Sequence, residues 1–241
     1  MLIYPLRLNK DIFTSRLRST AIPLSRILPS PYNKYQDRPE NKPKRLTAKP
    51  NEKLPMSHDH TTPPAIHHAI RCYQGNTPTL GERVYIDPAA VVIGDVVIGD
   101  HCSIWPCAVI RGDMHKVRIG HRTSVQDGAI LHITHAGQFN DDGWPLTIGD
   151  DVTIGHSVNL HGCTIGNRVL VGIGSIVLDG AVVEDEVVIG AGTLVPPGKV
   201  LASGYMYMGS PCKQIRPLKE NEKAYFTYSA NNYVKLKETF L

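Results

Sequence analysis

An aliphatic residue recurs at every sixth position along most of this chain, from residue 86 to residue 195. The series is interrupted after residues 110 and 131, and it slips by one residue before residue 165. A period of six is neither the period of 2 of an ordinary strand nor the 3.6 of a helix. The positions that keep the step are Ile86, Val92, Ile98, Ile104, Ile110, Ile119, Val125, Leu131, Ile148, Ile154, Leu160, Ile165, Val171, Val177, Val183, Ile189 and Val195.

A six-residue unit of this kind predicts a parallel β-helix. Each unit supplies a short strand and a corner, with the aliphatic side chain pointing inward and Gly, Asp or Asn accommodating the corner. One unit cannot bury its own apolar side chain, so stacked coils share a continuous core. We therefore predict an all-β protein, a left-handed parallel β-helix over residues 81–200. The left hand is taken from the hexapeptide-repeat families.

Two segments leave the repeat. Between Leu131 and Ile148 the sequence reads HITHAGQFNDDGWPLT, which predicts an excursion from the coil surface, and such loops often carry function. Residues 201–241 form a tail in which Phe226, Ala230 and Tyr233 recur at helical spacing. We expect a C-terminal α-helix packed on the solenoid.

The N-terminal residues differ in composition from the rest. Residues 1–55 hold 12 Lys and Arg against 4 Asp and Glu, while the other residues hold 14 against 18. Residues 1–55 therefore read as a disordered basic extension, either an organelle-targeting segment or sequence upstream of a true start at Met56. Residues 56–80 read as an irregular lead-in. The predicted location is the cytoplasm, or an organelle if the extension is a transit peptide.

Charge, cysteine content and hydropathy exclude several classes of protein. The positive charge belongs to the extension, so nucleic-acid binding is not expected. The five cysteines form no CxxC pair and no disulfide framework, which favours a reducing compartment. No apolar run approaches the ~20 residues of a membrane span. The expected substrate is a small molecule.

Histidines recur at related positions of the repeat. His156 and His161 lie in IGHSVNLHGC, and His132 directly follows Leu131 as His161 follows Leu160. A residue next to the inward aliphatic faces outward. Three neutral imidazoles and water form the open tetrahedral site of a catalytic zinc, although exposed histidines can equally be solvated. The predicted metal is Zn²⁺, with Fe²⁺ or Co²⁺ as alternatives.

Two polar segments accompany these histidines. Arg111 and Asp113 stand two apart in RGD, so on a strand they point to one face and could pair across a subunit boundary, or form a solvated corner. Gln126, in SVQDG, could hydrogen-bond a metal-bound water.

Together these segments resemble the γ-class carbonic anhydrase family, and within it the bacterial YrdA-type branch. The resemblance runs from about residue 80 to the end and does not cover residues 1–55. The matching elements are RGD (111–113), SVQDGAILH (124–132), IGHSVNLHGC (154–163), IVLDGAVVEDEVVIGAGTLVPPGK (176–199), GYMYMGSPCKQIRPL (204–218) and YSANNYVK (228–235).

The resemblance implies a homotrimer that hydrates carbon dioxide reversibly by metal-bound hydroxide at three interfacial sites. It implies that His132 and His161 come from one subunit and His156 from the next. It also implies roles for five further residues. Arg111 and Asp113 would make an inter-subunit pair, Gln126 would contact the metal-bound solvent, Asp127 would be a second active-site acid, and Tyr233 would approach from the helix.

The sequence also departs from the family's active archetype. Met114 replaces a Glu, Ser124 replaces an Asn, and a different insertion replaces the loop with the proton-shuttling Glu, for which Asp141, Asp142 or His135 are candidates. A missing shuttle slows turnover. The first alternative is therefore a weakly active or non-catalytic metal-binding trimer, or a thioesterase-like relative. The second is a hexapeptide acyltransferase, for which three histidines are redundant.

Overall fold

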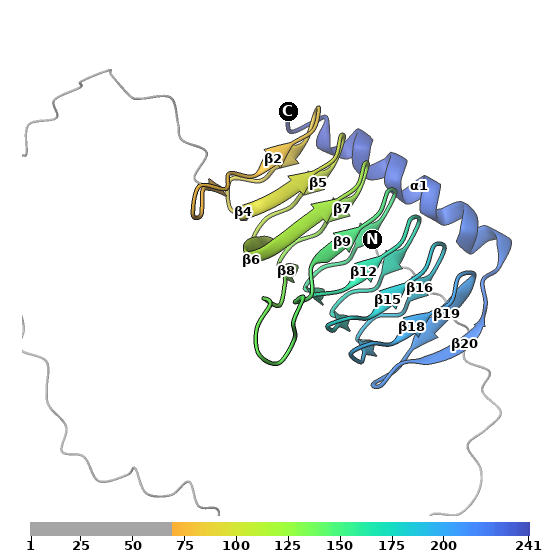
Figure 1. The fold of residues 1–241 in the computed structure, drawn as a ribbon. Helices are drawn as coiled ribbons and strands as arrows, with labels where there is room; N and C mark the ends of the chain where they lie inside the picture. The colour runs from red at the N-terminus through yellow and green to blue at the C-terminus, as the bar shows by residue number, and fades with distance from the viewer. Residues whose placement is uncertain (1–68) are drawn as a thin grey trace, which may run out of the picture. The chain divides into compact units, whose positions relative to one another are not determined.

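The computed structural model describes residues 69–241. The expectations for residues 1–55, and for the chain up to residue 68, lie outside the described part. Short strands stack coil upon coil into a parallel β-helix, and one helix runs along it (Figure 1). The predicted fold class is confirmed.

The strands form three stacks, and nearly all neighbours within a stack are parallel. The first two stacks share the long strands β4 and β6, which turn from one stack into the next. The first contains β1 (Ile70–Arg71), β4 (Val91–Ile98), β6 (Val109–Ile119), β8 (Ile130–His132), β11 (Asn159–His161), β14 (Ile176–Val177) and β17 (Leu194–Val195). The second adds β2 (Thr79–Leu80), β9 (Leu146–Ile148), β12 (Thr164–Ile165), β15 (Val182–Val183) and β18 (Val200–Leu201).

The third stack ends in the one antiparallel pair among the described strands, β19 with β20. It contains β3 (Tyr85–Ile86), β5 (Ser103–Ile104), β7 (Ser124–Val125), β10 (Thr153–Ile154), β13 (Leu170–Val171), β16 (Val188–Ile189), β19 (Tyr205–Met208) and β20 (Lys213–Pro217).

The repeat supplies the core. All seventeen aliphatic positions of the six-residue series are buried, and none is more than 6% exposed. Each stacks on its equivalent in the next coil, as Val125 does on Ile154 and Ile154 on Val171. The burial of each such side chain stabilises the fold by roughly 1.5–3 kcal/mol.

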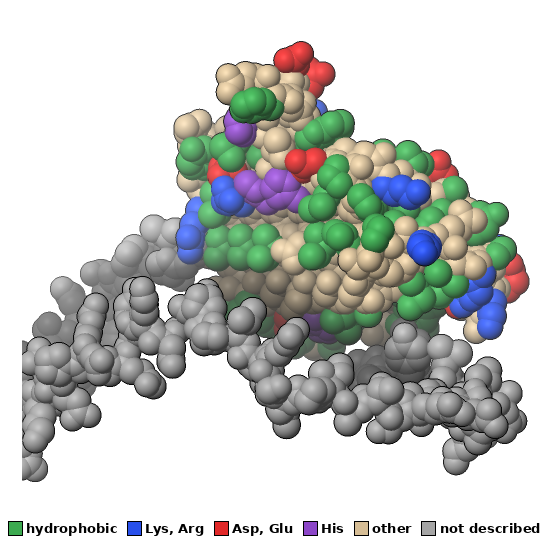
Figure 2. Space-filling view, turned by 90° about the horizontal axis from the view of Figure 1, so that it is seen from below, with side chains coloured by type: hydrophobic (Ala, Val, Ile, Leu, Met, Phe, Trp, Pro, Cys, Tyr) green, Lys and Arg blue, Asp and Glu red, His purple; other side chains and the backbone are tan. Residues whose placement is uncertain are grey.

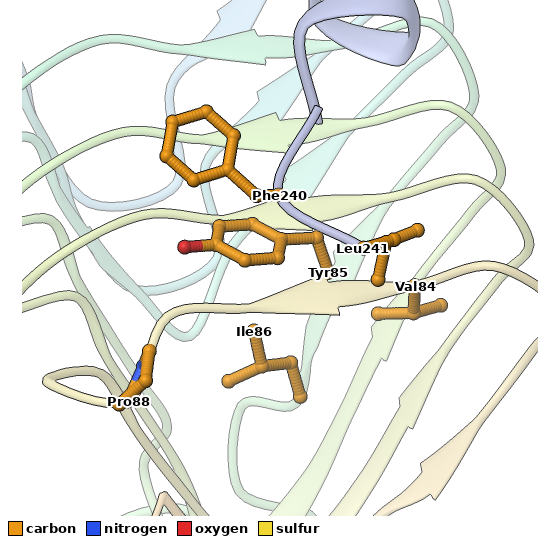
Figure 3. Close-up of a pocket in the computed structure, with 6 residues that line it drawn as sticks. All are labelled: Val84, Tyr85, Ile86, Pro88, Phe240 and Leu241. Atoms are coloured by element: carbon orange, nitrogen blue, oxygen red, sulfur yellow. The ribbon is translucent and has the colours of Figure 1, made fainter. Parts of the chain in front are cut away.

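Helix α1 (Glu220–Lys237) covers the third stack and runs back toward the first coils (Figure 1). Phe226 packs with Val188 and Leu218, and Ser229 Oγ hydrogen-bonds Thr153 Oγ1 at 2.8 Å. Beyond the helix, Phe240 lies against Tyr85 of the first coil (Figure 3). The predicted C-terminal helix is thus confirmed. Among residues 69–241, no helix is long and apolar enough to cross a membrane.

An ion pair joins β20 to the start of α1. The Arg216 guanidinium donates to both carboxylate oxygens of Glu222 at 2.7 Å, and the Lys219 N–H donates to Glu222 at 2.9 Å. The hydrogen bonds from Arg216 outweigh partial burial and lower the pKa of Glu222 to about 2.

We predict that Glu222→Gln destabilises the fold by about 1–2 kcal/mol at pH 7, since it removes a charge-assisted bidentate pair. Because the folded-state pKa of Glu222 is lowered, its contribution is complete above its ordinary value near 4.5 and declines as the pH falls toward 2. Urea titrations from pH 7 down to pH 3.5 should therefore show the gap to wild type narrowing. Glu220→Gln, at an exposed position of the same helix, should change stability little, and a gap independent of pH would contradict the assignment.

Candidate metal centre

His132 and His161 lie side by side at the ends of two neighbouring strands. They are register partners in β8 and β11. Nδ1 of His132 is 3.2 Å from Nε2 of His161. Tetrahedral zinc binds imidazole nitrogen at about 2.0–2.1 Å, which sets two ligand nitrogens roughly 3.3 Å apart. The spacing of the two nitrogens therefore fits zinc.

A carboxylate holds the far nitrogen of each ring. His132 Nε2 lies 3.0 Å from Asp113 Oδ1, and His161 Nδ1 lies 2.6 Å from Asp179 Oδ1. Ionised carboxylates only accept hydrogen bonds, so each neutral ring donates its N–H to the carboxylate. The two nitrogens that face each other then both carry lone pairs. Two facing acceptors require a cation or a proton between them.

Asp113 is also paired with Arg111. Both belong to β6, and within one chain the guanidinium donates directly to the carboxylate. Burial acts to raise the pKa of Asp113, but the hydrogen bonds from His132 and Arg111 outweigh it, so the pKa is lowered. Burial lowers the pKa of His132, while its hydrogen bond to Asp113 opposes this. A lowered pKa favours the neutral imidazole, which is the form that binds metals.

The other candidate residues gather in a second cluster. His156 Nδ1 lies 3.0 Å from Asp127 Oδ2, and both side chains are about half exposed. The neighbouring Gln126 is buried and its amide N–H donates to the Tyr233 hydroxyl of α1. Burial raises the pKa of Tyr233, so its phenol is neutral near pH 7. All three histidines thus have a carboxylate on one ring nitrogen, as metal-ligating histidines usually have.

One coil side separates the two clusters. His156 precedes the corner at Ser157, and His161 ends β11 on the far side of that corner. The chain turns at Ser157 and then runs along β11 to His161, so the two histidines lie at opposite ends of this coil side. Accordingly, no group of three His, Cys, Asp or Glu side chains within residues 69–241 of one chain is placed to hold a metal.

The outer surface between the clusters is largely apolar. The first residues of successive strands in the first stack form an outward column, continuous through their register except at Asn159. In this column Ile130 is 47% and Ile176 is 38% exposed. Figure 2 shows a face on which histidine side chains lie beside basic and acidic ones and among hydrophobic ones. The column's apolar members are Val91, Val109, Ile130, Ile176 and Leu194.

Sequence reasoning missed Asp179, which the structure places on His161. It stands 18 residues after His161, three units of the repeat, and that interval was the available clue. The two departures from the archetype differ in setting. Ser124 is buried, and its hydroxyl accepts from Trp105 Nε1 at 3.0 Å, whereas Met114 is 49% exposed.

Comparisons with known proteins agree with this architecture. A family model described as bacterial transferase hexapeptide (six repeats) matches residues 77–112. Protein YrdA of Escherichia coli is 64% identical over 172 residues, 71% of this chain and 94% of YrdA. A probable carbonic anhydrase of Methanocaldococcus jannaschii is 46% identical over 66% of this chain and 96% of its own length. The structure of a hexapeptide transferase family protein from Anaplasma phagocytophilum matches with a TM-score of 0.67 at 39% identity, covering 73% of this chain and 100% of that one.

Fold and repeat together define a hexapeptide-repeat β-helix protein. The identities over nearly the full length of the relatives narrow the class further. The chain belongs to the γ-class carbonic anhydrase-like family, on the branch of YrdA. This confirms the resemblance read from the sequence.

Proposed function

We propose that this protein is a metal-dependent carbonic anhydrase of the γ type, which hydrates carbon dioxide reversibly as a homotrimer with Zn²⁺ at its interfaces. The observation that carries the proposal is the 3.2 Å separation of His132 Nδ1 from His161 Nε2, in two rings whose other nitrogens each face a carboxylate. Asp113 and Asp179 occupy the outer ring nitrogens, so no proton of either neutral ring lies between the rings. A divalent cation satisfies both lone pairs.

His132 and His161 of one subunit would hold the metal together with His156 of the next. Zinc bound by three imidazoles supplies a nucleophile at neutral pH by lowering the pKa of water to about 7. Fe²⁺ and Co²⁺ also accept imidazole ligands, so the choice among these metals depends on supply.

The surrounding residues would orient the reactants. The Gln126 amide N–H donates to the Tyr233 hydroxyl, which leaves the Gln126 carbonyl and the phenol proton free to hold solvent or substrate oxygen. Arg111 brings a positive charge beside Asp113 and His132. Asp127 holds the His156 ring. In the assembled protein these groups would surround one site, because each chain contributes one cluster to each neighbour.

The trimer is supported by the geometry of one chain. The two clusters lie at opposite ends of one coil side, so neither cluster by itself supplies enough ligands for a metal ion within the described residues of one chain. A closed ring of heterologous contacts would join the His161 end of one chain to the His156 end of the next. The apolar column between the ends offers surface to bury in such contacts.

A weakly active metal-binding trimer is the second candidate, and two observations favour it. Met114 brings no acid beside Asp113, and the Ser124 hydroxyl is engaged by Trp105 inside the structure. Proton exit would then depend on the exposed acids of the excursion loop, Asp141 and Asp142.

Stopped-flow hydration of carbon dioxide tests the proposal. We expect zinc-loaded wild type to accelerate hydration well above the uncatalysed rate, and His161→Ala to reduce kcat/KM at least 100-fold, since losing a ligand empties the site. His121→Ala, which removes an exposed histidine outside both clusters, should retain wild-type rates. Zinc-loaded wild type at the background rate would reject the enzyme and leave the metal-binding trimer.

A further inference from the structure

The excursion loop, residues 133–145, is joined to the metal-site histidine His161 through Asp179. Two backbone hydrogen bonds between Thr134 and Trp144, of 3.1 and 2.8 Å, join the two ends of the loop. From its base, the Thr134 hydroxyl donates to Asp179 Oδ2 at 2.7 Å. The other oxygen, Oδ1, accepts from His161 Nδ1 at 2.6 Å. Asp179 therefore uses both oxygens, one toward the loop and one toward the histidine.

Two glycines show how closely the loop lies against this segment. A Cβ on Gly162 would lie 2.5 Å from Asp179 Oδ1 and 2.6 Å from Trp144 Cβ. A Cβ on Gly180 would lie 2.9 Å from Trp144 Cη2. Both glycines have positive φ, +54° and +68°, so any side chain there is also strained. The residues that follow His161 and Asp179 are thus the surface on which Trp144 rests.

The same arrangement recurs at the other ring. His132 donates to Asp113, whose second oxygen is held by Arg111 as that of Asp179 is held by Thr134. Each carboxylate is therefore fixed at both ends, and each fixes the tautomer of one imidazole. Asp113 is held within its own strand, whereas Asp179 is held from the excursion loop.

We propose that Asp179 is a positioning residue for the metal site and that the excursion loop sets metal affinity by holding it. This rests on the proposed function, since it takes His161 as a ligand. With Nδ1–H bound to Asp179, His161 presents the Nε2 lone pair toward His132. Without the carboxylate, the ring can rotate or take the other tautomer, and carboxylate partners of this kind are worth about 10–100-fold in metal affinity.

Competition with a chromophoric zinc chelator measures this affinity directly. We expect Asp179→Asn to weaken Zn²⁺ binding by about 10–100-fold. Thr134→Val should weaken it severalfold, and Thr134→Ser, which keeps the hydroxyl, should restore it. Asp185→Asn is the matched control, because Asp185 is another corner carboxylate but bonds Asn167 and Arg168 rather than a histidine. The visible spectrum of the Co²⁺ form should change in Asp179→Asn and stay unchanged in Asp185→Asn.

The outcomes separate this inference from the proposed function. Wild type that binds no zinc would reject the metal site itself. Wild type that binds zinc, with folded Asp179→Asn and Thr134→Val binding it equally well, would reject the positioning role alone. Should Asp179→Asn fail to fold, Thr134→Val against Thr134→Ser decides, since these differ at one loop side chain that touches no ligand.

Discussion

Samples of His156→Ala and of His161→Ala should each bind almost no zinc, and co-expression of the two should restore roughly a quarter of the wild-type sites in randomly mixed trimers. In the proposed trimer each site takes His132 and His161 from one subunit and His156 from the next. A His156→Ala chain still offers the first pair, and a His161→Ala chain still offers the third ligand. A mixed trimer therefore contains one junction at which all three meet.

Zinc per chain, measured by atomic absorption after gel filtration, checks this result. Co-expression of His132→Ala with His161→Ala is the matched control, because both lesions fall in the pair contributed by one chain and no mixed junction is complete. Recovery in the control equal to that in the test mixture would reject subunit sharing. A monomer by light scattering, or a full complement of zinc in either single variant, would also reject subunit sharing.

The sequence predicted the solenoid because the six-residue period records inward orientation directly. Every position of the series is buried, and even the slip before Ile165 leaves that side chain in register with Ile148 of the coil before. In a stacked coil, an aliphatic side chain of the repeat can be buried only by pointing into the shared core, so each position of the pattern corresponds to one core position.

The partners of the histidines could not be read from the repeat. Asp179 occupies a corner, and corners of this solenoid carry many acids, such as Asp150 and Asp185, that bond backbone N–H groups instead. Which corner acid meets a histidine depends on stacking between coils. Thr134 lies outside the repeat altogether, so its contact with Asp179 follows from where the excursion loop folds back.

The spacing of His156 and His161 in the sequence does not by itself tell whether the two histidines share one site. Two histidines five positions apart, as in IGHSVNLHGC, could mean one site if the segment were helical or looped. Because β11 is extended, the same spacing places them at opposite ends of a coil side. The period of six thus argues against a site within one chain, and the family resemblance supplied the subunit arrangement.

Ile165→Ala is expected to destabilise the protein by about 2–5 kcal/mol, the range for emptying a fully packed core position. Ile165 is 1% exposed and stacks between Ile148 and Val183 in the second stack, away from the histidines. Its removal would leave a cavity shared by three successive coils, which the repeat cannot refill because each inward position is fixed by its own unit. Urea unfolding followed by circular dichroism, at one fixed protein concentration because assembly contributes to stability, measures the loss.

Ile215→Ala makes the same chemical change at a side chain of β20 that is 51% exposed, and should cost less than about 0.5 kcal/mol. Equal losses in the two variants would contradict the inward assignment of the series. Zinc content under native conditions should be unchanged in both, since Ile165 lies in the second stack and Ile215 in β20, outside the strands that carry the histidines. That combination, a large loss of stability with an intact metal site, is the reverse of the result expected for His161→Ala. Ile165→Ala and His161→Ala together therefore distinguish the residues that build the solenoid from those that the solenoid holds in place for chemistry.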